Sequence, residues 1–405
     1  MAKTYDTYKD SGIAWIGKIP EKWIVGLVGK YFEEINKPNI NQEETNTLQF
    51  KMGEIISKSK GDSKYSPETI EAYNVVEPGT IMINGLNLSF DLVSQRIAQV
   101  RERGAITSTY LAIFPTKKMK SNYAKYLLKA YDNNKALHAM GRGLRATLSY
   151  RTFRSEPVIV PSLDEQQAIA SYLDEKCGEI DSLISLQEEM ISELQDYKQS
   201  VITEAVTKGL NPNVSMKDSG VEWIGEIPNK WDVCKMQYII NLQSGHNLTT
   251  EQITDKGAYP VFGGNGIRGY YQDYSHEGDY VLIGRQGALC GNINYAHQKF
   301  WPTEHAVVCY PKIPCNYKWL GETLKAMKLG QYSLSAAQPG LSVERIKQLK
   351  LPLPPLSEQQ AIASYLDEKT SQIDSLIALK QEKITELKDY KKSIIYEYVT
   401  GKKKV

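Results

Sequence analysis

The glycines Gly264, Gly266 and Gly269 have the GxGxxG spacing with which a loop can hold a nucleotide or S-adenosylmethionine. Such a site requires the glycines to open a helix whose N-terminus faces the ligand. Here they lead into the β-prone pair Tyr270 and Tyr271. We therefore predict a strand-loop hairpin at this place and no cofactor site.

Other catalytic patterns are absent from the sequence. It has no (N/D)PP(Y/F) segment to hold a flipped base, no GxxxxGK[ST] phosphate loop and no HExxH pair. Its five cysteines lack CxxC spacing, which argues against a zinc site and a disulfide framework. We predict that the chain is not an enzyme, has no catalytic residue and binds neither a metal nor a cofactor.

Basic and amide side chains gather in glycine-containing segments of two blocks, residues 23–161 and 231–354. Such groups suit phosphate contacts and the bidentate reading of base edges in DNA. Any one cluster has a solvated surface as its alternative interpretation. The candidate DNA-binding residues are Lys58, Lys60, Lys64, Asn84, Asn87, Arg96, Arg142, Arg145, Arg151, Asn265, Arg268, Arg285, Gln286 and Gln338.

Composition sets broad limits on these interpretations. The 405 residues are 41% hydrophobic and 24% charged, which is ordinary for globular domains and allows two or three of them. A net charge of +2 neither requires nor excludes nucleic acid, because a local basic face can lie within a neutral total. No apolar run is long enough for a membrane span and the N-terminus is too polar for a signal peptide, so we predict a cytoplasmic protein with no membrane contact.

An internal repeat organises the chain. Residues 9–25 recur at 217–233 with 12 of 17 positions identical, and residues 165–207 recur at 358–400 with 30 of 43 identical. The offsets are 208 and 193 positions, so the segment between the two motifs is 15 residues longer in the first half. The end of the chain would also continue into its beginning, which predicts a circular, pseudo-twofold arrangement.

The second repeated segment predicts a long amphipathic helix in each half. Asp164 with Gln167, and Ser357 with Gln360, have the spacing of a capping box, and each stands after a proline. Apolar residues then recur at coiled-coil spacing, so we predict that the two helices pair antiparallel. The predicted pairing residues are Ile180, Leu183, Leu194, Tyr197, Val201, Ile373, Leu376, Leu387, Tyr390 and Ile394.

These elements predict an α/β (α+β) fold with two globular domains of mixed or β-rich sheets. Within the variable blocks we expect short helices near 121–131 and 319–328. The predicted boundaries are an N-terminal segment 1–22, a first recognition domain 23–161, a spacer helix 162–210, a linker 211–230 that repeats the N-terminal motif, a second recognition domain 231–354 and a spacer helix 355–405.

The paired KDSG and WIG motifs, the two variable blocks and the helix openings PSLDEQQAIASYLDEK and PPLSEQQAIASYLDEK closely resemble the specificity subunits of type I restriction-modification systems. The resemblance covers essentially the whole chain. It implies that each variable block reads one half of a bipartite, asymmetric double-stranded DNA site. It also implies that the helices set the gap between the two halves.

The same resemblance implies partner subunits that carry the chemistry. Two methyltransferase subunits would dock on the helices, and two motor-endonuclease subunits would join for restriction. S-adenosylmethionine, ATP and Mg would be bound by those partners, and the assembled complex would methylate adenine N6 and cleave DNA with ATP. Two alternatives stay open: a specificity component of a related type II restriction enzyme, and a coiled-coil scaffold that binds no DNA.

Overall fold

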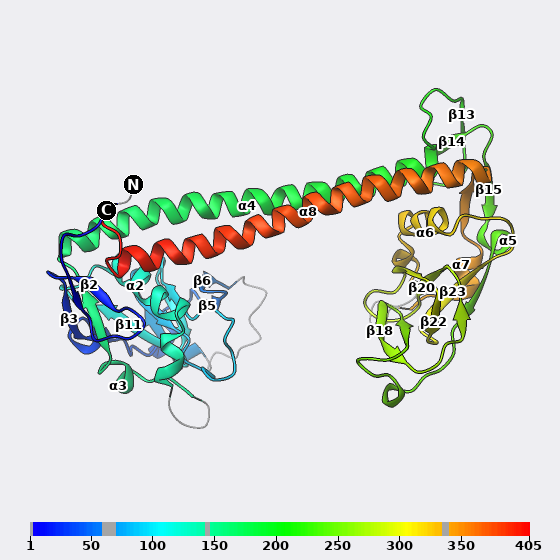
Figure 1. Ribbon diagram of the computed structural model, residues 1–405. Helices are drawn as coiled ribbons and strands as arrows, with labels where there is room; N and C mark the ends of the chain where they lie inside the picture. Colours follow the sequence, from blue (N-terminus) through cyan, green and yellow to red (C-terminus); the bar gives the residue numbers. More distant parts are fainter. Residues whose placement is uncertain (1–2, 59–69, 142–145, 334–339) are drawn as a thin grey trace. The chain divides into compact units, whose positions relative to one another are not determined.

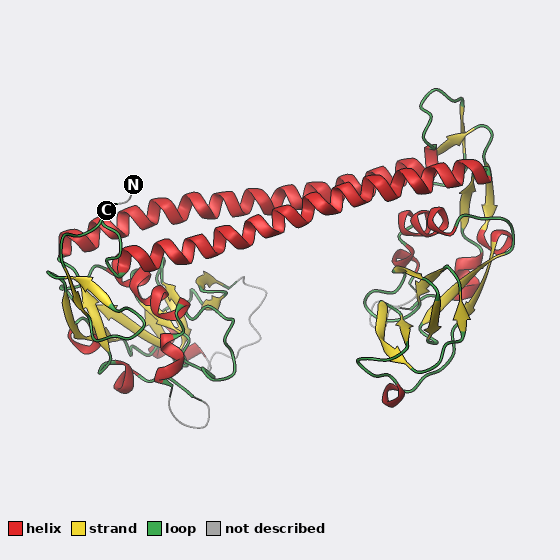
Figure 2. Cartoon of the chain, viewed as in Figure 1, coloured by secondary structure: helices red, strands yellow, loops and turns green. Residues whose placement is uncertain are grey.

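The computed structural model describes residues 3–58, 70–141, 146–333 and 340–405, which form two compact units (Figure 1). Unit 1 comprises residues 1–187 and 382–405, and unit 2 comprises residues 188–381. Both units combine helices with mostly antiparallel sheets, as Figure 2 shows, so the α+β class predicted from the sequence is confirmed. Each long helix contributes one of its halves to each unit.

The long helices are α4 (Leu163–Lys208) and α8 (Leu356–Val399). Each is followed by a glycine in the left-handed region, Gly209 with φ 75° and Gly401 with φ 70°, as is usual at helix C-termini. Both helices therefore end before the predicted boundaries at residues 210 and 405. They begin within one residue of the predicted boundaries 162 and 355, but the predicted capping residues Asp164 and Ser357 lie inside the helices.

The start of α4 shows why the predicted capping boxes were wrong. Glu165 N donates to Ser162 Oγ at 3.3 Å, and Ser162 Oγ donates to Glu165 Oε2 at 3.3 Å. The capping pair thus lies two residues before the predicted pair Asp164 and Gln167. In the second helix Ser357 already lies within α8, and Gln359 N donates to Pro355 O instead.

The repeated EQQ sequence joins each long helix to its own unit. Glu165 accepts a hydrogen bond from Trp23 Nε1 at 3.3 Å, and Glu358 accepts one from Trp231 Nε1 at 2.8 Å. Both tryptophans are fully buried, so their replacement by alanine would cost about 3–5 kcal/mol. The repeat in the sequence is therefore a repeat of structural anchors.

The glutamines that follow hold a second helix in place. Gln166 Oε1 accepts from Lys120 N, just before α2 (Ser121–Asn133), at 2.8 Å. Gln359 Oε1 accepts from Asn316 N, just before α6 (Tyr317–Ala326), at 2.9 Å. These two helices stand where the sequence predicted short helices, so that prediction is confirmed.

The KDSG motifs form matching hairpins, β1 (Tyr8–Asp10) with β2 (Lys18–Pro20) and β13 (Met216–Asp218) with β14 (Glu226–Pro228). In each turn the aspartate accepts from the glycine amide at 2.9 Å, Asp10 from Gly12 and Asp218 from Gly220. Both glycines have positive φ, which explains the choice of residue.

Each unit contains a four-stranded antiparallel sheet with the same topology. In unit 1 the order is β4 (Phe32–Glu34), β11 (Leu111–Pro115), β8 (Ile81–Ile83) and β9 (Ile97–Gln99). In unit 2 it is β16 (Ile240–Ser244), β23 (Ala306–Pro311), β20 (Tyr280–Gly284) and β21 (Ile293–Ala296). The two blocks share a fold although their sequences differ.

Further strands surround these sheets. A pair of strands precedes each long helix, β3 (Ile24–Leu27) with β12 (Pro157–Val160) and β15 (Asp232–Lys235) with β24 (Lys350–Leu353). Unit 1 adds β5 (Leu48–Lys51), β6 (Glu54–Ser57), β7 (Tyr73–Val76) and β10 (Gly104–Thr107). Unit 2 adds β17 (Tyr259–Gly263), β18 (Gly266–Tyr271), β19 (His276–Glu277) and β22 (Lys299–Pro302).

Short helical segments complete the elements. In unit 1 they are η1 (Val28–Lys30), η2 (Ile40–Gln42), η3 (Ala136–Met140) and α3 (Tyr150–Phe153). In unit 2 they are α5 (Met236–Ile239), η4 (Thr250–Gln252), η5 (Leu329–Tyr332) and α7 (Val343–Lys347).

The two long helices pair antiparallel within each unit, as predicted. An ion pair joins Lys391 to Asp181 at 2.6 Å in unit 1, and its counterpart joins Lys198 to Asp374 at 2.7 Å in unit 2. Six of the ten predicted pairing residues are buried or half-buried: Ile180, Leu194, Val201, Ile373, Leu387 and Ile394.

The other four predicted pairing residues are exposed on the helix surface. They are Leu183 and Leu376, each 48% exposed, with Tyr197 at 58% and Tyr390 at 57%. Their assignment to the helix pairing was wrong, because two helices in contact bury a narrow stripe and the predicted stripe was too wide.

The two ends of the chain lie side by side in unit 1 (Figure 1). Lys404 N donates to Lys3 O at 2.8 Å, and these residues form an isolated β-bridge. The chain ends thus meet where, in unit 2, a continuous linker connects α4 to β13. Among the described residues, none of the helices has the length and apolar character needed to cross a membrane.

Candidate nucleic-acid interface

Two loops occupy the same topological position in the two sheets. In unit 1, residues 84–96 connect β8 to β9, and in unit 2, residues 285–292 connect β20 to β21. Five of the candidate DNA-binding residues lie in them: Asn84, Asn87, Arg96, Arg285 and Gln286. These five candidates therefore lie at equivalent places in the two sheets.

In unit 2, the 285–292 loop faces the hairpin of β17 and β18 across a pocket of about 520 Å³. This hairpin is the strand-loop structure predicted for the GxGxxG segment, and Val261 to Phe262 carries a register shift. The pocket is lined by Gly263, Gly264, Asn265, Arg268, Gln286, Gly287, Ala288, Leu289 and His305. The structure thus brings together three predicted residues, Asn265, Arg268 and Gln286.

The side chains of this pocket are held by neighbours yet remain accessible. Asn265 Oδ1 accepts from Asn292 Nδ2 at 2.6 Å, and Arg268 Nη2 donates to Thr250 Oγ1 at 3.0 Å. Asn265 and Arg268 are exposed, and Gln286 is exposed as well. A preformed set of amide and guanidinium donors at a concave surface suits hydrogen bonding to base edges or phosphates.

Two glycines allow the loop and the hairpin to approach each other. A Cβ atom built on Gly284 would lie 1.9 Å from the backbone oxygen of Gly264. A side chain at position 284 would therefore push the hairpin turn away from the loop. The glycine pattern serves close backbone packing here, which the sequence did not distinguish from a ligand cradle.

His305 also belongs to this pocket, although it was not among the predicted site residues. Its Nε2 lies 3.2 Å from Glu304 Oε1, and the residue is half-buried. Nothing in the local sequence marks it, because the strand order alone brings it beside the glycine hairpin. Arg285, next to the pocket, donates from Nη1 to Ser244 Oγ at 3.3 Å.

In unit 1, Arg96 does not fit its predicted role as a DNA contact. Its side chain is 1% exposed and donates to the carbonyl oxygens of Asn84 at 2.9 Å and of Leu86 and Asp91 at 2.7 Å. Its backbone N–H also donates to Asp132 Oδ2 at 2.7 Å. Arg96 fixes the 84–96 loop from within, because the buried guanidinium satisfies carbonyls that the loop cannot pair itself.

The remainder of the 84–96 loop is held by its own turn. Asp91 Oδ1 accepts from Val93 N at 3.1 Å and from Ser94 N at 2.9 Å. Hydrogen bonds from Ser94 lower the pKa of Asp91 to about 2, so this carboxylate is ionised at neutral pH. Asn87 is exposed with φ 51°, and Asn84 is half-buried at the start of the loop.

The other predicted contacts of unit 1 lie apart from this loop. Lys58 is half-buried after β6, with its Nζ 5.8 Å from the centre of the Tyr73 ring. Arg151 is exposed in α3. Lys60, Lys64, Arg142, Arg145 and Gln338 lie outside the described residues.

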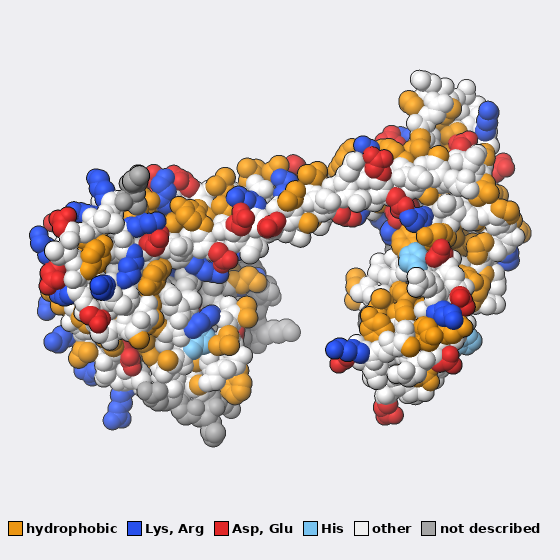
Figure 3. Space-filling view, viewed as in Figure 1, with side chains coloured by type: hydrophobic (Ala, Val, Ile, Leu, Met, Phe, Trp, Pro, Cys, Tyr) orange, Lys and Arg blue, Asp and Glu red, His pale blue; other side chains and the backbone are white. Residues whose placement is uncertain are grey.

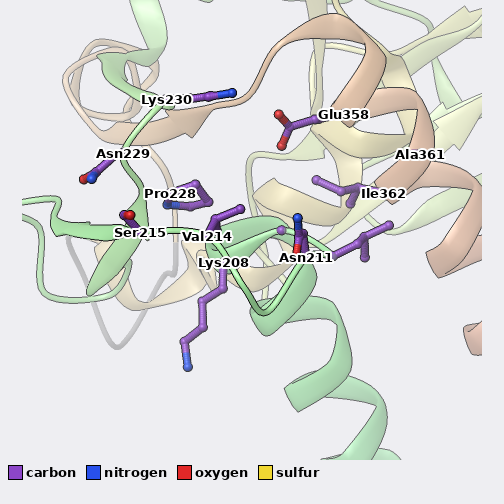
Figure 4. A pocket seen from close by; sticks show the side chains of 12 residues that line it. Lys208, Asn211, Val214, Ser215, Pro228, Asn229, Lys230, Glu358, Ala361 and Ile362 are labelled. Atoms are coloured by element: carbon purple, nitrogen blue, oxygen red, sulfur yellow. The ribbon is translucent and has the colours of Figure 1, made fainter.

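A further pocket, of about 560 Å³, lies at the other end of unit 2, where α4 ends and α8 begins (Figure 4). Its lining includes Lys208, Asn211 and Lys230 together with Glu358, the partner of Trp231. It contains no residue of the 285–292 loop or of the β17–β18 hairpin. This pocket belongs to the repeated scaffold and not to the surface that carries the predicted contacts.

Comparison with known proteins agrees with this architecture. A family model described as the type I restriction modification DNA specificity domain matches residues 228–389. The specificity subunit of the type I restriction enzyme EcoprrI from Escherichia coli is 40% identical over 170 residues, which are 42% of this chain and 41% of that protein. The matched region thus spans less than half of that relative.

Other matches extend over nearly the full length of the chain. The type I restriction enzyme MjaVIII specificity subunit of Methanocaldococcus jannaschii is 24% identical over 423 aligned residues, covering 96% of this chain and 94% of that one. A chain from a solved structure, reported for complex assembly and conformational transition of the type I R-M system, has a TM-score of 0.71. It is 15% identical and covers 94% of this chain and 98% of its own, so the likeness is one of fold.

Proposed function

Because the chain belongs to the specificity subunits of type I restriction-modification systems, we propose that it supplies DNA sequence specificity to methylating and cleaving partners. In this proposal each unit reads one half of a bipartite, asymmetric site in double-stranded DNA. The observation that carries it is the pair of loops, 84–96 and 285–292. They connect equivalent strands of a shared sheet topology, but their sequences differ.

The long helices are proposed to dock the methyltransferase subunits. Leu183, Leu186 and Tyr390 are 48%, 48% and 57% exposed on the helices of unit 1. Their repeat counterparts in unit 2, Leu376, Leu379 and Tyr197, are 48%, 61% and 58% exposed. Figure 3 shows hydrophobic side chains on the surface of both helices. Large apolar residues at these positions suit contact with helices of two like partners, one for each unit.

We propose that partner subunits carry out DNA methylation and cleavage. The described residues include no group of three or more His, Cys, Asp or Glu side chains that would hold a metal ion. We propose that two methyltransferase subunits bind S-adenosylmethionine and take up a flipped adenine for N6 methylation. Two motor-endonuclease subunits, with ATP and Mg, would complete the complex for restriction.

The two-reader proposal is tested by exchanging residues 231–354 for the corresponding block of another specificity subunit. The hybrid is expressed with its methyltransferase, and the methylated motif is read by methylome sequencing. We expect one half of the motif to change and the other half, with the gap, to stay the same. If both halves change, the two units do not read independently.

The spacing role of the helices has its own test. The two units should contact DNA about one helical turn apart, so that both face one side of the duplex. Insertion of four residues into both helices, after Leu186 and after Leu379, should alter the gap between the half-sites without altering either half. An unchanged gap in the methylated motif would refute the spacing role.

A further inference from the structure

The 84–96 loop presents large apolar side chains to solvent. Val93 is 91% exposed, Phe90 77% and Leu92 57%. Single exposed apolar residues are ordinary on protein surfaces, but three within four positions of one loop need a reason. Burial of such side chains against a ligand is favourable, so this loop has the character of a contact surface.

The backbone beneath these side chains is fixed before any ligand binds. Arg96 holds the carbonyls of Asn84, Leu86 and Asp91, and the His138 ring lies 3.1 Å from the Asp91 oxygen through Nε2. The turn at Asp91 is closed by the amides of Val93 and Ser94. A rigid loop loses little conformational entropy on binding, which favours a specific contact.

A lysine-rich pocket adjoins the loop within unit 1. It has a volume of about 570 Å³ and is lined by Leu92 and Val93 together with five lysines and two aspartates. The lysines are Lys129, Lys135, Lys388, Lys391 and Lys392. Two of them are paired, Lys391 with Asp181 at 2.6 Å and Lys392 with Asp389 at 2.8 Å.

Charge at this pocket favours an anion. Burial lowers the pKa of Lys129, and the charges of Lys391 and Lys125 lower it further. An anion placed in the pocket would offset this repulsion. A duplex offers closely spaced phosphates beside base edges that include the apolar methyl group of thymine, which matches a basic pocket next to an apolar loop.

The polar residues of the same loop indicate which base pair the loop would contact. Asparagine reads adenine through N6 and N7, and apolar side chains contact the C5-methyl group of thymine. Asn87 is exposed and Asn84 half-exposed in a loop that also carries Phe90 and Val93. An A·T pair presents both features in the major groove. The equivalent loop of unit 2 offers Arg285 and Gln286 instead, which are polar readers.

We propose that Phe90 and Val93 read thymine methyl groups in the half-site bound by unit 1, while the adjoining lysines hold the DNA backbone. This inference rests on the proposed function and assigns residues and a base feature to it. It predicts that both hydrogen bonds and the methyl groups of particular thymines contribute to the affinity of the protein for this half-site.

The test uses the full-length chain with its methyltransferase and a duplex carrying the motif found by methylome sequencing. Each thymine of both half-sites is replaced in turn by uracil, which removes only the methyl group. At one or more positions in one half-site we expect the wild-type complex to bind about fivefold more weakly. Phe90→Ser with Val93→Ser should weaken binding to the thymine duplex about tenfold and abolish the further loss with uracil.

Leu289→Ser provides a matched control, because Leu289 is 57% exposed in the equivalent loop of unit 2. It should leave the uracil effect in the first half-site unchanged. The inference is overturned if no thymine shows the effect, or if the loss persists in the Phe90 and Val93 variant. It is also overturned if that variant binds DNA normally but no longer co-purifies with the methyltransferase.

The same binding assay tests the proposed function separately. If the wild-type complex does not prefer the motif duplex over an unrelated duplex, the specificity role itself fails. If it does prefer the motif but shows no methyl dependence, only the assignment of Phe90 and Val93 fails.

Discussion

The 84–96 loop of unit 1 and the 285–292 loop of unit 2 connect equivalent pairs of strands in the two sheets, yet different contacts stabilise them. The first is held from inside by hydrogen bonds from the buried guanidinium of Arg96. The second is packed through backbone contact, where the carbonyl of Gly264 approaches Gly284. The longer loop exposes three large apolar side chains, Phe90, Leu92 and Val93, whereas the shorter one exposes only Leu289.

This difference separates the contacts that both units share from the loops that differ between them. Both loops connect equivalent strands, and each unit holds its long helix by the same Trp–Glu and Gln–backbone contacts. None of those contacts involves a residue of either loop. The sequence of a loop can therefore change while these contacts of the long helices stay the same.

The largest effect is expected from Arg96→Met, which keeps most of the side-chain volume but removes its donors. The carbonyls of Asn84, Leu86 and Asp91 would be left without these partners, which should destabilise the local structure by about 3 kcal/mol. Hydrogen exchange of the β8 and β9 amides measures this effect. The exposed Arg101, changed to Met, is the control and should shift stability by less than about 0.5 kcal/mol. Equal protection in both variants would contradict the internal role of Arg96.

The second effect, in unit 2, is expected from Gly284→Ala. The added Cβ atom would meet the Gly264 oxygen, so the hairpin turn must move, at a cost of about 1–3 kcal/mol. Faster exchange in β17 and β18 and weaker binding of the second half-site should follow, while unit 1 is unchanged. Gly178→Ala, in α4 with open space around it, should instead stabilise the helix by about 0.5–1 kcal/mol. Unchanged exchange in the hairpin would show that the close approach is not needed.

The smallest effect concerns the pH dependence of stability in unit 2, which contains four of the five histidines. Burial, and then the nearby His246, lower the pKa of His276 below its usual 6.5. As the pH falls through 6.5 the unfolded chain takes up the proton first, so this contribution to stability is present above 6.5 and is lost below it. Thermal unfolding of the wild type and of His276→Gln should diverge by about 1–2 °C between pH 7.5 and 5.5. Parallel curves would mean that His276 has no such role.

Much of the fold follows from the sequence, because local patterns determine it. The long helices, α2, α6 and the glycine hairpin were predicted from periodicity and turn residues, which act over short distances. The cap of α4 was misplaced by two residues, since Ser162 and Asp164 both stand at positions that a cap can occupy. The pairing stripe was too wide, because periodicity does not tell which apolar residues a partner helix covers.

The candidate site depended far more on tertiary structure. The repeat, the two variable blocks and their basic and amide side chains follow from residue type and order alone. The same residues do not tell that Arg96 is buried while Phe90 and Val93 are exposed, or that His305 joins Asn265 and Gln286 at one pocket. Those outcomes depend on which distant strands become neighbours, and burial is decided only when the sheet has assembled around each side chain.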